Sequence, residues 1–209
     1  ALQVTPWRDR EKGDYVSLYA NYNYNKDRVE SLWSGRKYWI MPNYKVAYAV
    51  GDPVQYYMPL FYRINPDNGN PAVMTADPSR VATTADGSPK DAWNQAIGKD
   101  RYPHHVGGFG LSASYFGFYM QADFNFVVGK WMVSNDIYFF NNPVKFPTAN
   151  LSKEVIDNYW TPDRRDARYP RPELQVWSPF DSRMLSDASF LRMKNFTFGY
   201  SVPRRWLER

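Results

Sequence analysis

Large apolar side chains recur at every second position in several stretches of this 209-residue chain. In residues 15–25, for example, apolar or aromatic residues occupy the even positions and asparagines and a serine occupy odd ones. Period two places successive side chains on opposite faces and is typical of a strand with one apolar face. The pattern predicts seven strands, at residues 2–7, 15–25, 38–50, 54–64, 107–116, 118–130 and 189–200.

The clearest pair of strands is GGFGLSASYFGFYMQADFNFVVGKW, residues 107–131. The chain turns at Phe116–Gly117, and so short a connection predicts an antiparallel hairpin. One face of the hairpin is apolar throughout. The other face is polar but not highly charged, and in the second strand it carries Tyr119, Gln121, Asp123 and Asn125.

The last predicted strand changes its pattern halfway. Apolar side chains fall on odd positions up to Met193 and on even positions from Phe196. One extra residue at Lys194–Asn195 would form a β-bulge and return the apolar set to a single face. We therefore predict a bulge there, with one apolar face made of Leu191, Met193, Phe196, Phe198 and Tyr200.

The predicted connections alternate between short and long. Arg8–Asp14, Gly51–Pro53 and Phe116–Gly117 are short, whereas residues 26–37, 65–106 and 131–188 form long connections. All short turns then lie at one end of an antiparallel up-and-down meander, as in outer-membrane barrels. Strands of about ten residues also suit a tilted crossing of a bilayer. One short helix is predicted in SKEVIDNYW, with Ser152 as its N-cap.

Composition narrows the class of protein. Aromatic residues make up 18% of the chain, while the mean hydropathy is −0.63. This combination suits β-structure, a carbohydrate-binding surface or the aromatic girdles of a membrane barrel. No apolar run is long enough for a transmembrane helix. The N-terminal stretch ALQVTPWRDREKGD does not resemble a signal peptide, so an exported protein would carry this chain as an internal piece.

Most residues that could form a metal site, a nucleic-acid contact or a catalytic pair have a simpler explanation. The chain has no cysteine, and His104–His105 lacks nearby further ligands, so we expect no metal site and no cofactor. The net charge of +5 has no clustered basic run, which argues against nucleic-acid binding. Four carboxylates lie among arginines and at no fixed separation, which indicates a solvated loop and no catalytic pair: Asp157, Asp163, Asp166 and Glu173.

Four aromatic residues in the last long connection are the candidates for binding. They are Tyr159, Trp160, Tyr169 and Trp177. Such rings can stack on sugars or contact a partner protein. The alternative is that they pack the connection upon itself and on its neighbours.

Five stretches resemble landmarks of a known family, in its order and spacing. They are KGDYVSLYANYNYNKDRVESL, YAVGDPVQYYMPLFYRINPDNGNP, IGKDRYPHHVGGFGLSASYFGFYMQADFNFVVG, EVIDNYWTPDRRDARYPRP and SDASFLRMKNFTFGYSVPRRWL. From Glu11 to Leu207 the chain resembles the C-terminal half of SusC/RagA-like TonB-linked outer-membrane transporters. The tyrosines and prolines of residues 54–62 depart from the glycine-richer version expected there.

The resemblance implies an all-β fold, part of a transmembrane barrel of about 22 strands with long extracellular loops. Residues 1–209 would be a partial barrel domain that lacks the plug and the closing strands. The protein would be a multi-pass outer-membrane transporter, typical of Bacteroidota, that imports glycans or peptides without catalysis. Its partners would be membrane lipid, a SusD-like surface lipoprotein and the TonB complex, the last acting through the plug.

The same resemblance gives the candidate residues their places. Tyr119, Gln121, Asp123 and Asn125 would face the barrel lumen. The connections 65–106 and 131–188 would meet the lipoprotein. Two alternatives remain open, a soluble aromatic-rich β-sandwich that binds carbohydrate and a piece of a secreted glycoside hydrolase. The sandwich predicts a chain that is soluble alone, and the hydrolase predicts two carboxylates at a fixed separation in a cleft.

Overall fold

The computed structural model describes the chain except for residues 42–44, 75–80, 83–92, 142–147, 149, 174–180, 204–205 and 207–209. The chain divides into two compact units. Unit 1 comprises residues 1–26, 102–130 and 188–209, and unit 2 comprises residues 27–101 and 131–187.

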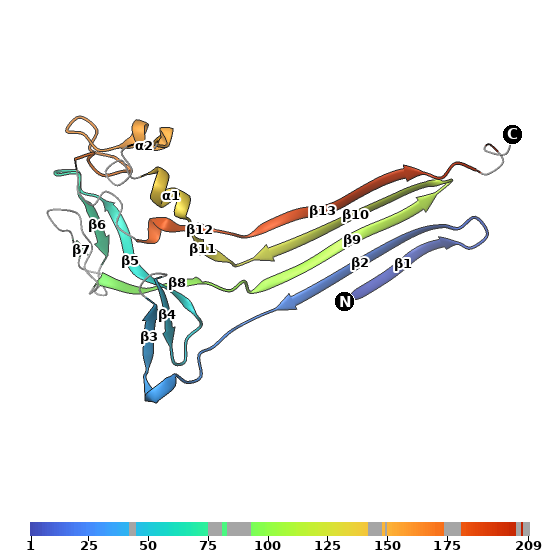
Figure 1. Cartoon of the computed structure of the whole chain (residues 1–209), viewed down its shortest axis with the longest axis horizontal. Coiled ribbons are helices and arrows are strands. Elements are labelled where there is room, and N and C mark those ends of the chain that lie inside the picture. Colours follow the sequence, from blue (N-terminus) through green and yellow to red (C-terminus); the bar gives the residue numbers. More distant parts are fainter. Residues whose placement is uncertain are drawn as a thin grey trace. The chain divides into compact units, whose positions relative to one another are not determined.

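Unit 1 is an antiparallel sheet whose described strands run in the order β1-β2-β9-β10-β13 (Figure 1). Their bounds are β1 Leu2–Asp9, β2 Asp14–Tyr24, β9 His105–Tyr115, β10 Phe118–Val128 and β13 Phe190–Tyr200. The short turns β1–β2 and β9–β10 lie at one end of the sheet, and both long connections leave from the other end. The predicted alternation of short and long connections is confirmed for this sheet.

The predicted bulge in β13 is confirmed. Asp123 pairs with Asn195, and the next residue of β10, Phe124, pairs with Met193, so Lys194 is the extra residue. Lys194 and Asn195 of β13 thus lie opposite the single residue Asp123 of β10. This extra residue keeps the apolar side chains of β13 on one face. A second register shift lies in β1, between the pairs Val4–Leu18 and Trp7–Val16.

One face of the unit 1 sheet is apolar and exposed. Leu191 and Phe198 are 64% and 63% exposed, which is unusual for side chains of this size in a water-soluble sheet. Aromatic rings gather toward both ends of the strands. Trp7 contacts Tyr115 at the short-turn end, with ring centroids 6.1 Å apart, and Tyr24 contacts His105 at the other end, at 5.2 Å.

Unit 2 contains short antiparallel strands. They are β3 Tyr38–Met41, β4 Val46–Ala49, β5 Gln55–Ile64, β6 Pro71–Met74, β7 Val81–Ala82, β8 Asn94–Asp100, β11 Trp131–Val133 and β12 Leu185–Asp187. The first five run in the order β3-β4-β5-β6-β7, β8 pairs with β5, and β11 pairs with β12. A buried hydrophobic cluster in this unit is formed by Val46, Val54, Tyr56 and Met58.

Two of the predicted strands are therefore assigned differently by the structure. The segment 38–50 is not one strand, because it folds back as the antiparallel pair β3 and β4, and Lys45 just before β4 has a positive φ of 49°. The segment 54–64 does form a strand, β5, but it pairs within unit 2. The prediction of seven strands in one meander was wrong, because period two detects a strand without identifying its neighbour.

The described part of unit 2 also contains two short α-helices. The helix α2, Lys153–Asn158, lies where the sequence predicted one and begins after Ser152, whose side chain makes no cap hydrogen bond. The helix α1, Asn135–Phe140, was not predicted, and there the Ser134 hydroxyl accepts a hydrogen bond from the Ile137 amide. Within the described ranges, no helix is long and apolar enough to cross a membrane.

Candidate functional site

A network of polar side chains centres on Asp123, on the polar face of the unit 1 sheet. The Tyr19 hydroxyl donates to Oδ1 of Asp123 at 2.8 Å. The amide groups of Gln121 and Asn195 donate to Oδ2 of Asp123 at 2.9 and 3.3 Å. Asp123 and Asn195 are also the backbone pair next to the bulge. The network therefore joins β2, β10 and β13 at the position where the register changes.

Tyr19 reaches Asp123 by lying across β9. A Cβ atom added to Gly110 would stand 2.3 Å from Cε1 of Tyr19, which leaves no room for a side chain at that position. Tyr119 lies over Gly199 of β13 in the same way, and an added Cβ would stand 2.3 Å from its ring. Glycine is therefore required at both places by the close approach of a ring to the backbone.

The structure brings together the four residues predicted to line a lumen. Tyr119, Gln121, Asp123 and Asn125 alternate along β10 and lie on its polar face. Tyr19 and Asn195 belong to the same network and were missed. Gly110 and Gly199 lie inside predicted strands, where glycine can mark the close approach of another group. One sequence does not identify which ring covers which glycine.

The predicted aromatic residues of the last long connection have separate roles. The Trp160 indole Nε1 donates to the Pro66 carbonyl at 3.0 Å. Its ring covers Gly69, where an added Cβ would meet it at 2.6 Å. The backbones of Tyr159 and Tyr169 form an isolated β-bridge. Trp160 thus fixes residues 159–171 onto the turn after β5, and Trp177 lies outside the described residues.

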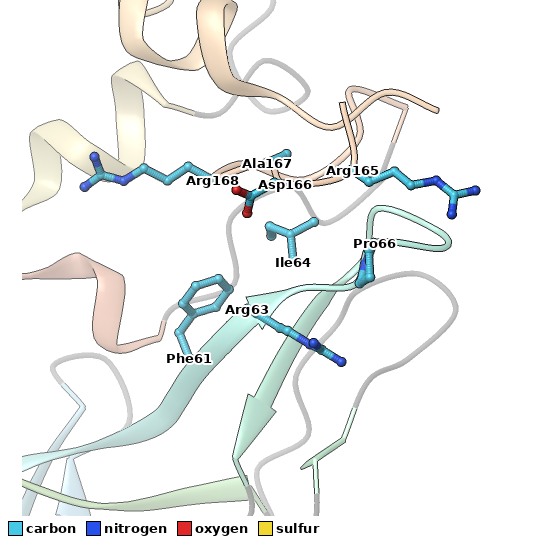
Figure 2. Close-up of a pocket in the computed structure, with 8 residues that line it drawn as sticks. All are labelled: Phe61, Arg63, Ile64, Pro66, Arg165, Asp166, Ala167 and Arg168. Atoms are coloured by element: carbon cyan, nitrogen blue, oxygen red, sulfur yellow. The ribbon is translucent and has the colours of Figure 1, made fainter. Parts of the chain in front are cut away.

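A cavity of about 330 Å³ lies beneath this connection. Its walls come from the end of β5, the turn after it and residues 165–168 (Figure 2). The lining is Phe61, Arg63, Ile64, Pro66, Arg165, Asp166, Ala167 and Arg168. We call it the Asp166 cavity, because the carboxylate of Asp166 is turned toward Phe61 and Ile64 in Figure 2.

A second cavity, of about 340 Å³, shares Arg168 with the first. It is lined by Ile137, Asn141, Glu154, Arg168, Tyr169, Arg183, Met184 and Leu185. Burial, and then the charge of Glu154, raises the pKa of the Tyr169 phenol above its usual value. Tyr169, one of the predicted aromatic residues, thus lines this second cavity.

The two histidines lie at the end of the unit 1 sheet from which the long connections leave. The Tyr22 hydroxyl is 2.7 Å from Nδ1 of His105, and the two rings are stacked. No group of three or more metal-ligating side chains occurs in the part of the chain that the structure describes. Both histidine rings also contact the ring of Tyr24.

Comparisons with known proteins find a similar TonB-dependent receptor by sequence and a similar peptide transporter by structure. No family model matches the chain. Over 108 residues, 52% of its length, the chain is 28% identical to the TonB-dependent receptor P3 of Formosa agariphila (strain DSM 15362 / KCTC 12365 / LMG 23005 / KMM 3901 / M-2Alg 35-1), and this match covers 10% of that receptor.

Solved structures are similar over nearly the whole chain. A chain of the RagAB peptide transporter superposes with a TM-score of 0.85 and 30% identity, covering 99% of this chain and 23% of that one. The RagAB peptide importer in its "open-open" state gives 0.85 and 29%, covering 98% and 22%. This chain therefore spans less than a quarter of the length of these transporter chains. The predicted resemblance to SusC/RagA-like TonB-linked transporters is confirmed.

Proposed function

Proceeding from this likeness, we propose that the chain forms part of the barrel of a TonB-dependent outer-membrane transporter that imports large nutrients, either glycans or peptides. Residues 1–209 are one portion of that barrel domain. The observation that carries the proposal is the unit 1 sheet, which exposes one apolar face and keeps its polar side chains on the other. Such a two-sided sheet suits a wall between lipid and water.

The apolar face of this sheet faces lipid in the proposed barrel. Strands β2, β9, β10 and β13 each have 11 residues, as a tilted crossing of the hydrocarbon core requires. The rings toward both ends of the strands then lie at the two membrane interfaces. The bulge at Lys194 allows β13 to keep Leu191 and Phe198 in lipid together.

The polar face of the sheet faces the lumen. Asp123 is in the middle of β10, where an unpaired carboxylate in lipid would be strongly unfavourable. On the lumen side it is hydrated and also accepts hydrogen bonds from Tyr19, Gln121 and Asn195. The proposed lumen residues are Tyr119, Gln121, Asp123 and Asn125.

Unit 2 belongs to the external loops in this proposal. Its two segments leave the sheet at the end opposite the short turns, and in outer-membrane barrels the long connections are extracellular. A SusD-like lipoprotein would meet these loops. TonB would supply energy through a plug domain elsewhere in the protein, and this portion would take no part in catalysis.

The membrane assignment is tested by neighbouring substitutions on opposite faces of β9. Leu111 lies on the apolar face and Ser112 on the polar face, both near mid-strand. Leu111→Arg should sharply reduce folded full-length protein in the outer-membrane fraction, because arginine facing lipid costs about 2–4 kcal/mol at the midplane. Ser112→Arg should leave most of it.

Folding is read from the shift in gel migration between unheated and boiled samples, after fractionation of the cells. Equal effects of the two arginines would overturn the assignment of the faces. A full-length protein that is monodisperse and cooperatively folded without detergent would overturn the proposal as a whole.

A further inference from the structure

We propose that the Asp166 cavity binds the basic side chain, lysine or arginine, of an imported peptide. This inference rests on the proposed function in that the ligand is a transported substrate, and it selects peptides over glycans. It concerns unit 2 alone. The residues that carry it are Phe61, Ile64, Pro66, Asp166 and Ala167.

The cavity has an apolar floor. Phe61 and Ile64 from β5, with Pro66 and Ala167 beside them, supply the apolar walls, and Ile64 is 5% exposed. Lysine and arginine carry three or four methylene groups between the backbone and the charge. Such a stem suits apolar walls, whereas a sugar would need several polar partners around its ring.

The one acidic group in the lining, Asp166, is exposed and turned toward the apolar side chains. In Figure 2 the carboxylate of Asp166 stands above Ile64, while the guanidinium groups of Arg165 and Arg168 extend away from it in opposite directions. Among the described residues, no cation forms an ion pair with Asp166. An ammonium or guanidinium group entering the cavity would therefore find an available acceptor for a charge-assisted hydrogen bond.

The three arginines in the lining contact other groups. Arg165 lies 3.8 Å from Asp67, and Arg168 pairs with Glu154 of α2. Arg63 lies over the ring of Tyr62, 5.3 Å from its centroid. The two ion pairs offset the charges of Arg165 and Arg168, and in Figure 2 the guanidinium of Arg63 extends away from Asp166. Asp166 is thus the lining charge left for a ligand to pair with.

The aromatic wall is held in place from behind. The Arg183 guanidinium stacks on Phe61 at 4.1 Å and is fixed by the fully buried carboxylate of Asp181, with Nη2 to Oδ2 at 2.7 Å. The Phe61 amide also donates to the Ser182 hydroxyl at 3.0 Å.

The opposite wall is held by the connection that carries Asp166. Trp160 bonds to the Pro66 carbonyl, and the Arg171 amide donates to the Gly69 carbonyl at 3.1 Å. Both walls are thus fixed before a ligand arrives, which lowers the entropy lost on binding.

The test measures binding of synthetic peptides to the detergent-solubilised full-length protein by isothermal titration calorimetry. Three hexapeptides differ at one position, which holds lysine, norleucine or glutamate. Norleucine keeps the apolar stem without the charge. We expect the lysine peptide to bind about fivefold more tightly than the norleucine peptide, since an exposed carboxylate in water contributes modestly.

Asp166→Asn should abolish that preference, and Asp166→Arg should reverse it in favour of glutamate. Asp163→Asn is the matched control, because Asp163 lies on the same connection, is exposed and does not line the cavity. The control should keep the lysine preference. Circular dichroism checks that each variant is folded.

Two results would overturn the inference: equal binding of the lysine and norleucine peptides, or a lysine preference that Asp166→Asn leaves unchanged. Both are independent of membrane insertion, which the arginine substitutions in β9 test. A protein that inserts correctly but shows no lysine preference therefore refutes the cavity alone.

Discussion

The hydroxyl of Tyr19 donates a 2.8 Å hydrogen bond to the carboxylate of Asp123, although the two residues belong to strands that are not neighbours. The strand between them contributes Gly110, over which the tyrosine ring lies. The row continues to Asn195, the last regular pair before the extra residue of β13. Through Asp123, the side chain of Tyr19 in β2 is thus linked to Asn195, beside the bulge of β13.

Removing the Tyr19 hydroxyl should destabilise the folded full-length protein. A hydrogen bond to a charged group contributes about 1.5–3 kcal/mol, and exposure to water should place Tyr19→Phe near 1 kcal/mol. The measurement is urea unfolding in detergent micelles, followed by gel migration. Tyr119→Phe is the control, because that ring also covers a glycine but its hydroxyl bonds to no described residue. Equal losses in the two variants would mean that the bond to Asp123 adds nothing.

Gly110→Ala should destabilise the sheet through a steric clash with Tyr19. The added methyl group would stand 2.3 Å from the ring, so either the ring or the strand must move, at a cost of about 1–3 kcal/mol. The double variant with Tyr19→Ala should recover most of the loss. The ring is then absent, and the Asp123 carboxylate, which would stand 2.7 Å from the added Cβ, is released from the Tyr19 hydroxyl and can shift. A double-mutant cycle in urea measures this coupling. A coupling near zero would show that the ring does not depend on Gly110.

A local sequence pattern predicts where strands lie in this fold, but it does not predict which strands pair. Strands β2, β10 and β13 follow from period two, because a sheet with one apolar face repeats that pattern along each strand. The bulge at Lys194 followed from a change of parity within one strand. The pairing of residues 54–64 did not, because neighbours in a sheet are chosen by contacts that a local pattern does not contain.

In the candidate site too, a local pattern predicts some residues and not others. Alternation along β10 predicted which side chains share the face of Asp123, whereas Tyr19 lies more than a hundred residues away in the chain. The sequence left open whether Trp160 binds a ligand or packs the connection, and its indole packs against the turn at Gly69. The Asp166 cavity escaped detection because its floor comes from a strand whose partners were predicted incorrectly.

Replacing Phe116 should stabilise the turn between β9 and β10. Phe116 and Gly117 both have positive φ, 51° and 84°, as a two-residue hairpin turn of type I′ requires. Phenylalanine is strained in that region and asparagine tolerates it, so Phe116→Asn should raise stability by about 0.5–1 kcal/mol. Gly117→Ala should act in the opposite direction, since its methyl group would also meet Tyr200 at 2.9 Å. Thermal unfolding in detergent compares them, and a lower melting temperature for Phe116→Asn would contradict the turn assignment.

Deleting Lys194 should be tolerated, whereas deleting Thr197 should not. Lys194 is the extra residue of the bulge, so its removal leaves the apolar side chains before and after it on one face with regular pairing. Removing Thr197 instead shifts every residue between the deletion and the bulge by one position, which turns Phe196 toward the polar face and Asn195 toward the apolar one. Both deletions shorten β13 by one residue, so each controls for strand length.

The comparison is read as the amount of heat-modifiable full-length protein in the outer-membrane fraction. The Lys194 deletion should remain near the parent level, because Asn195 still pairs with Asp123 and Met193 with Phe124. The Thr197 deletion should fall well below it, since an amide then faces lipid near mid-strand, where burial of an unpaired polar group is unfavourable. If the two deletions reduce assembly equally, β13 tolerates either face, and the bulge has no part in keeping its apolar residues together.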